Sequence, residues 1–305
     1  MRLRAGLLML IAFATVATAG TAQDAPEAAA PAKDRNIIVR PPPTEAERHK
    51  QLRDFTREVV RPPKMRQPIA KFAFPVCVKV LGLAPEDGEA IAERVRENAE
   101  ALGVGADRSP ECVPTVRVAF MAPAAGPATG WLTSESPQLA HLASYQRERV
   151  LAESGPVRAW NKVVVRNAEG QPFHYADPKA VLDRGVALPP LFEPFSATDP
   201  IVTTEITGAA VLIAREAAHG FTFGQLADYA TMRALLDIGA PEGEVAAPTI
   251  LTLFTAPDPP DGLTVFDKAL VRELYDASRN VKPRRVYNDI ARAAVAAERS
   301  DEGRN

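Results

Sequence analysis

The chain has 305 residues, 46% of them hydrophobic and 24% charged, which is a globular composition large enough for one sizeable core or two small ones. A formal net charge of −2 provides no sustained basic field, so the attraction that dominates nucleic-acid binding is missing and we expect no nucleic-acid partner. The 28 prolines indicate long irregular connections between the elements.

The first 19 residues have the three parts of a secretory signal peptide. Arg2 and Arg4 precede an apolar run over 5–13, and Ala17-Thr18-Ala19 offers small residues for cleavage after Ala19 or three residues later. An uncleaved anchor is the alternative, but the run is shorter than the roughly 20 residues that cross a bilayer. We therefore expect a secreted or periplasmic protein with no membrane span after signal removal.

Residues 20–69 form the expected tether, which is rich in proline and alanine and contains one short helix. Between Thr44 and Val60, the side chains of Leu52, Phe55 and Val59 share one side of this helix. The prolines before and after it block both helix and sheet pairing. Packing of the helix on the following domain is the simplest interpretation, and a partner-binding helix is the alternative.

The segment 70–282 is expected to be a single α/β domain that begins with a strand, a helix and a second strand. Phe74 to Val80 and Thr115 to Met121 are apolar runs typical of strands, and Pro85 to Leu102 has apolar residues at helical spacing. Because a crossover of this length brings its strands side by side, we expect the two strands to be parallel neighbours in the sheet.

Cys77 and Cys112 are the only two cysteines of the chain. Cys77 lies in the first strand and Cys112 just before the second, so the crossover brings them together. In an exported protein this placement favours a disulfide, which would stabilise by roughly 3 to 4 kcal/mol on a chain-entropy estimate. A metal site would need more ligands, and a catalytic thiol would need a distant histidine.

The later elements complete a mixed β-sheet packed by helices. First come a helix over 136–153, a strand over 157–166 and a turn over 167–170. A covering loop over 171–200 and a strand over 206–214 follow. The segment 283–305 is expected to be a C-terminal helix and tail, with the helix over 284–299.

Two further helices are predicted between the last strand and the tail. Thr222 and Gln225 have the spacing of a capping box, so a helix should begin at Phe223, leave Asp228 and Thr231 for water, and end at a left-handed Gly239. Another helix should follow Thr264 and Asp267, which have the same spacing. Both are expected to dock on one core.

The order of patterns in residues 219–277 resembles the closing half of metzincin-type zinc proteases. The first pattern is a buried helix. Three short sequence patterns follow it in order: Thr249-Ile250-Leu251, Leu263-Thr264-x-x-Asp267 and Leu274-Tyr275. Members of that family have H-E-x-x-H-x-x-G-x-x-H on the helix, a short Ser-Ile-Met-like segment and an L-T-x-x-D helix ending in Leu-Tyr. The resemblance implies a zincin-like fold.

The best register with that family places Gln225, Tyr229 and Leu235 at the zinc-ligand positions, Leu226 at the general base and Met232 at the glycine. None of these side chains supplies imidazole nitrogen, and leucine cannot take a proton from metal-bound water. The resemblance therefore implies an inherited fold without the chemistry, with no metal, no cofactor and no catalytic residue.

The wider chain resembles an uncharacterised set of secreted proteobacterial proteins. These have a cysteine in the first strand, a second cysteine before another strand, and a helix with a Q-L-A-D-Y-type sequence, which here begins at Gln225. This second resemblance covers most of residues 70–276 and implies no activity.

Few residues are candidates for a site. The four histidines, His49, His141, His174 and His219, have no metal-ligand spacing, and no nucleotide or serine-hydrolase motif is present. Gln225, Asp228 and Tyr229 are the candidates to line a groove where the protease family has its active site. The simpler interpretation is a structural pair between Asp228 and Arg233 or Arg158.

The sequence thus predicts an exported, non-catalytic binding or envelope-associated protein with an unknown protein or peptide partner. Its fold is expected to be a single α/β domain. The competing hypothesis is a secreted or periplasmic hydrolase whose active site has no recognisable motif.

Overall fold

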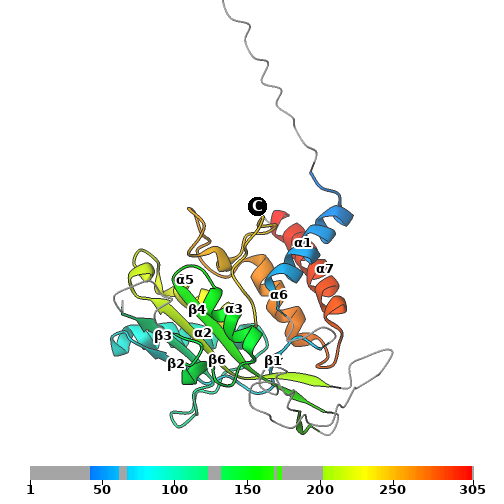
Figure 1. The fold of residues 1–305 in the computed structure, drawn as a ribbon. Helices are drawn as coiled ribbons and strands as arrows, with labels where there is room; N and C mark the ends of the chain where they lie inside the picture. The colour runs from blue at the N-terminus through cyan, green and yellow to red at the C-terminus, as the bar shows by residue number, and fades with distance from the viewer. Residues whose placement is uncertain (1–41, 62–66, 123–131, 168–169, 174–201, 304–305) are drawn as a thin grey trace, which may run out of the picture. The chain divides into compact units, whose positions relative to one another are not determined.

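The computed structural model describes residues 42–61, 67–122, 132–167, 170–173 and 202–303, and Figure 1 shows their arrangement. The expected signal peptide, residues 20–41 of the tether and nearly all of the expected covering loop lie outside the described residues. The residues from Pro43 to Asn305 form one compact unit.

A mixed six-stranded sheet runs through the described part of this unit in the order β2-β3-β6-β4-β5, with β1 on β6 beyond the end of β3. The strands are β1 (Lys71–Phe72), β2 (Val78–Leu81), β3 (Val116–Met121), β4 (Val157–Arg166), β5 (Pro172–Phe173) and β6 (Thr203–Ala214). The pairs β2-β3, β3-β6 and β1-β6 are parallel, whereas β4 is antiparallel to β5 and β6. The predicted fold class, a mixed sheet packed by helices, is confirmed.

The predicted crossover is present as β2, helix α2 (Pro85–Ala101) and β3. Proline at the first helical position and two acidic residues in the first turn suit the start of α2, and Gly103 follows its end with φ 82°. The two strands are parallel neighbours, with Val78 opposite Val116. The first strand begins four residues later than expected because Val76 pairs instead with Ala106.

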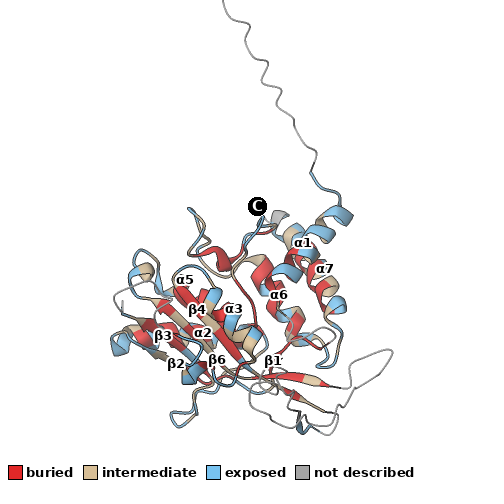
Figure 2. Cartoon of the chain, in the orientation of Figure 1, coloured by how far each residue is buried: buried red, intermediate tan, exposed pale blue. Residues whose placement is uncertain are grey.

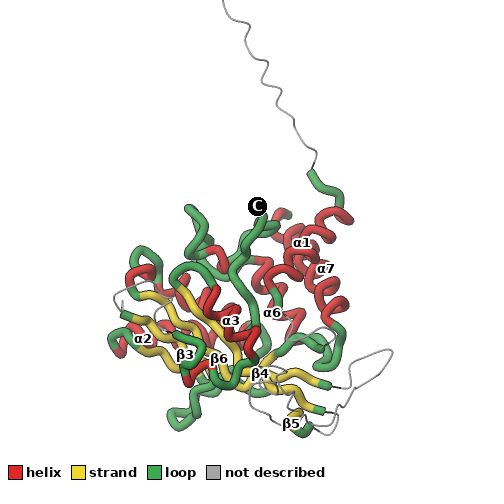
Figure 3. Tube along the Cα trace, viewed as in Figure 1, coloured by secondary structure: helices red, strands yellow, loops and turns green. Residues whose placement is uncertain are grey.

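The two faces of the sheet bury different cores. Along β6, Val211 and Ile213 point into the main core with Val118 of β3, and α2 and helix α5 (Phe223–Leu235) pack there. Ala210 and Leu212 alternate to the other face. They contact a second core cluster, which consists of Leu132, Leu139, Leu142, Val150 and Trp160. Figure 3 shows the strands of the sheet and the helices that pack on it.

The single helix expected over 136–153 is wrong. The chain forms a short 3-10 turn, η2 (Pro137–Leu139), and then helix α3 (Ser144–Ala152). Ala143 is extended between them, and its N–H donates to Gln146 Oε1 at 3.1 Å. Leu139 and Leu142 nevertheless both enter the second core cluster, together with Val150 of α3.

Three helices cover the rest of the main core: α1 (Glu45–Val59), α6 (Val265–Asp276) and α7 (Pro283–Glu302) (Figure 2). The predicted helix after Thr44 is confirmed as α1, with Leu52, Phe55 and Val59 buried. The Phe55 ring lies 5.2 Å from that of Phe266 on α6. Helix α1 also packs against α7, so the simpler interpretation, packing on the domain, describes it.

The predicted disulfide is present between Cys77 and Cys112, whose Cα atoms are 6.0 Å apart. It ties the start of β2 to the segment before β3. No helix in the part of the chain that the structure describes combines the length and the apolar content needed to span a membrane.

Replacing both cysteines by serine is expected to lower the free energy of unfolding by about 3 to 4 kcal/mol, because the bridge closes a loop of 35 residues in the unfolded chain. Urea denaturation of the oxidised protein and of the double variant measures the difference. An unchanged midpoint and slope would show that the bridge contributes nothing to stability.

Candidate functional site

Helix α5 begins as its sequence predicts. The Thr222 hydroxyl accepts from Gln225 N at 3.1 Å, and Gln225 Oε1 accepts from Thr222 N at the same distance, so the capping box is complete. These two bonds satisfy amide groups at a helix start that is partly buried. Gln225, the first of the candidate groove residues, therefore uses its side-chain oxygen to cap its own helix.

Every residue of α5 from Gln225 to Leu235 is buried. The expectation that Asp228 and Thr231 face water is therefore wrong: they are 1% and 0% exposed. Helix α2 packs along this side of α5, and Asn98 Nδ2 donates to Asp228 Oδ1 at 2.7 Å and to Thr231 Oγ1 at 3.1 Å.

The predicted end of α5 is also wrong. The helix stops at Leu235, and Leu236 is already extended, with φ −133° and ψ 148°. Gly239 does not take a left-handed conformation, and its N–H donates to Val59 O at 3.1 Å. A Cβ at Gly239 would lie 1.7 Å from Arg61 Nη2, so this glycine makes room for a guanidinium rather than for a helix end.

The positions that resemble the zinc ligands are parts of the packed core. Gln225 Nε2 donates to Pro260 O at 3.0 Å. The Tyr229 hydroxyl accepts from Arg233 Nη1 at 2.9 Å, and burial raises the pKa of Tyr229. Leu235 is fully buried. Within the described ranges, no three His, Cys, Asp or Glu side chains are grouped as metal ligands.

The buried Asp228 carboxylate joins three elements. Its Oδ1 accepts from Arg94 Nε at 2.9 Å on α2, and its Oδ2 accepts from Leu263 N at 2.9 Å in the loop before α6. With the Asn98 bond, both oxygens are satisfied. The predicted ion pair of Asp228 with Arg233 or Arg158 is wrong in its partner. Asp228 pairs instead with Arg94, which is 134 residues away in sequence.

The other patterns of the protease resemblance have a structural role. Asp267 Oδ1 accepts from the Thr249 hydroxyl at 2.5 Å, and Oδ2 accepts from Ile250 N at 2.8 Å and Thr264 N at 3.0 Å. One carboxylate thereby holds the 3-10 turn η4 (Ile250–Thr252) against the start of α6. The predicted capping box at Thr264 is confirmed, and its Asp267 carboxylate also bonds η4.

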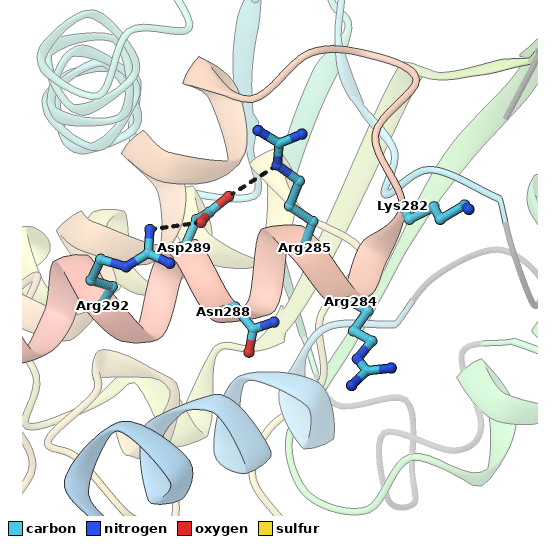
Figure 4. A pocket seen from close by; sticks show the side chains of 6 residues that line it. All are labelled: Lys282, Arg284, Arg285, Asn288, Asp289 and Arg292. Atoms are coloured by element: carbon cyan, nitrogen blue, oxygen red, sulfur yellow. Dashed lines mark hydrogen bonds and ion pairs between the residues drawn. The ribbon is translucent and has the colours of Figure 1, made fainter. Parts of the chain in front are cut away.

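A pocket of about 490 Å³ lies on the N-terminal half of α7 and was not anticipated from the sequence. Its lining residues are Lys282, Arg284, Arg285, Asn288, Asp289 and Arg292, which we call the α7 basic pocket. Figure 4 shows Arg285, Asp289 and Arg292 on one side of the helix and Arg284 with Asn288 on another. Arg285 and Arg292 both reach Asp289, whereas Lys282 and Arg284 point away from it.

The charge of the α7 basic pocket is unbalanced. Four cations face one carboxylate, Asp289, which contacts Arg292 at 2.9 Å and Arg285 at 3.9 Å. The side chains of Arg285 and Arg292 are 77% and 71% exposed, so both remain accessible to a partner.

The start of α7 opposes the helix dipole. Its first turn has no acidic residue, and Lys282 makes no side-chain cap, whereas α1, α5 and α6 each begin with a capping box. Cations at the positive end of a helix are each unfavourable by about 0.3 to 1 kcal/mol. This arrangement does not serve the stability of α7. The Lys-Pro-Arg-Arg sequence at its start was the signal that could have revealed it.

No protein-family model, no curated protein and no solved structure matches this chain. The function is therefore argued from the geometry of its own residues.

Replacing Gly262 by alanine is expected to lower the free energy of unfolding by about 1 to 3 kcal/mol. The new Cβ would lie 2.6 Å from Asp228 Oδ2, which cannot move away because its carboxylate is held by α2 and by Leu263. Gly224→Ala is the matched control, since its Cβ would meet only the Thr222 hydroxyl at 3.7 Å. Urea denaturation in which the two variants lose equal stability would contradict the proposed constraint.

Proposed function

We propose that this chain is an exported, non-catalytic binding protein, and that its α7 basic pocket binds an acidic segment of a protein or peptide partner. The observation that supports this most directly is the pocket of about 490 Å³ lined by four cations and one carboxylate. The disulfide between Cys77 and Cys112 is compatible with export to an oxidising compartment.

The placement of α5 supports a binding role over a hydrolytic one. A hydrolase of the protease type would need its helix to present a metal-bound water to substrate. Here the corresponding side chains are buried, and the amide of Gln225 and the hydroxyl of Tyr229 are already hydrogen-bonded within the protein. These groups therefore hold the core together, whereas Arg285 and Arg292 on α7 are accessible.

The spacing of the exposed arginines suits an extended acidic chain. Arg285 and Arg292 are seven residues apart on α7, which corresponds to about 10 Å along the helix. An extended peptide in the polyproline II conformation rises about 3.1 Å per residue with three residues per turn, so carboxylates three residues apart share one side and lie about 9 Å apart.

The double variant Arg285→Gln/Arg292→Gln is expected to bind a fluorescently labelled polyglutamate peptide about tenfold more weakly than the natural chain, because the two cations whose spacing suits the peptide are removed. Fluorescence anisotropy measures the affinity, which should also fall as salt is raised. Arg299→Gln is the matched control, since Arg299 is on the same helix outside the pocket. Equal affinity of the double variant and the control, or equal binding of labelled polyglutamine, would contradict the proposal.

Exported protein purified without added metal or chelator is expected to contain far less than one zinc ion per chain, because no imidazole stands at the three positions that resemble zinc ligands. Elemental analysis by mass spectrometry gives the ratio. One zinc per chain, retained on dialysis, would favour the competing hydrolase hypothesis.

A further inference from the structure

A second group of charged side chains lies where the ends of α1, α3 and α5 meet. We call it the arginine junction, and its members are Arg61, Arg149, Glu153, Arg158, Arg233 and Asp237. Two backbone hydrogen bonds join the end of α1 to the segment after α5: Arg61 N donates to Asp237 O at 2.9 Å, and Gly239 N donates to Val59 O at 3.1 Å.

The carboxylates of the junction are already matched. Arg149 Nη2 contacts both oxygens of Asp237, at 2.9 and 3.0 Å, and Arg233 Nη2 contacts Glu153 Oε1 at 2.6 Å. Four guanidinium groups therefore share two carboxylates, which leaves two cations in excess. Arg158, which has no carboxylate partner among the described residues, is only 2% exposed. A charge held in such surroundings is costly unless an opposite charge compensates it.

Two of the guanidinium groups also have unused donors. Arg233 Nε is buried and has no hydrogen-bond partner in the described part of the chain. The half-buried Arg61 guanidinium lies over Gly239 and makes no hydrogen bond or ion pair with any described residue. Burial, and after it the neighbouring Arg149, lowers the pKa of Arg61. Native structures seldom leave such donors unsatisfied.

We propose that the arginine junction binds one inorganic oxyanion of the phosphate or sulfate type. A dianion would balance the excess of two positive charges, and the planar guanidinium group matches an oxyanion with parallel N–H donors. Arg61, the most accessible of the unmatched groups, would be its principal ligand. This site is independent of the α7 basic pocket and of the proposed function.

The test is isothermal titration calorimetry of the full mature chain with inorganic phosphate, and separately with sulfate, in chloride buffer of constant ionic strength. The natural chain is expected to bind one phosphate per chain, and Arg61→Met to bind it at least tenfold more weakly. Arg285→Met removes the same charge from the α7 basic pocket and is expected to leave phosphate affinity unchanged.

Circular dichroism and urea denaturation in chloride buffer check that Arg61→Met folds. Its stability should be no lower than that of the natural chain, because the change removes a cation that has no partner among the described residues. The proposal is overturned if neither anion gives saturable binding, if Arg61→Met binds as tightly as the natural chain, or if only Arg285→Met weakens binding.

Discussion

The burial of α5 on all sides from Gln225 to Leu235 is the constraint on which the rest of the structure depends. A polar side chain in such a helix must find a partner inside the protein, because water cannot reach it. Asp228 therefore binds α2 and the loop before α6, and Arg233 binds Glu153 at the end of α3. Groups from other elements bind the carbonyls of α5: Asn161 of β4 donates to Ala234 O and Tyr275 of α6 to Leu235 O. Each pairing fixes one neighbouring element.

The same constraint separates structure from function in this chain. Groups that are engaged in holding α5 are not available to bind a substrate or a metal ion. The α7 basic pocket and the side chain of Arg61 in the arginine junction take no part in these pairings. Both sites have more cations than carboxylates although the whole chain has a formal net charge of −2. The distribution of charge is therefore more informative about binding than its sum.

Helix α7 shows how packing can maintain an electrostatically unfavourable surface. Its inner face buries Val286, Ile290, Ala291 and Ala294 in the main core, and the pairs with α1 include Arg48 Nε to Glu298 Oε2 at 2.9 Å. Burial of this apolar face stabilises the helix enough to tolerate cations at its positive end. Sequences break a local rule of this kind most often where a surface is used for binding.

The sequence by itself determined the features that depend on neighbours a few residues away. Capping boxes at Thr44, Thr222 and Thr264 set three helix starts, and the strand-helix-strand pattern brought Cys77 and Cys112 together. Only the tertiary structure decided which groups meet across long separations. It paired Asp228 with Arg94 across 134 residues, ended α5 early by pairing Gly239 with Val59, and spread the cations of α7 around an open pocket. Local periodicity cannot contain these outcomes, because each depends on which elements pack against each other in the folded chain.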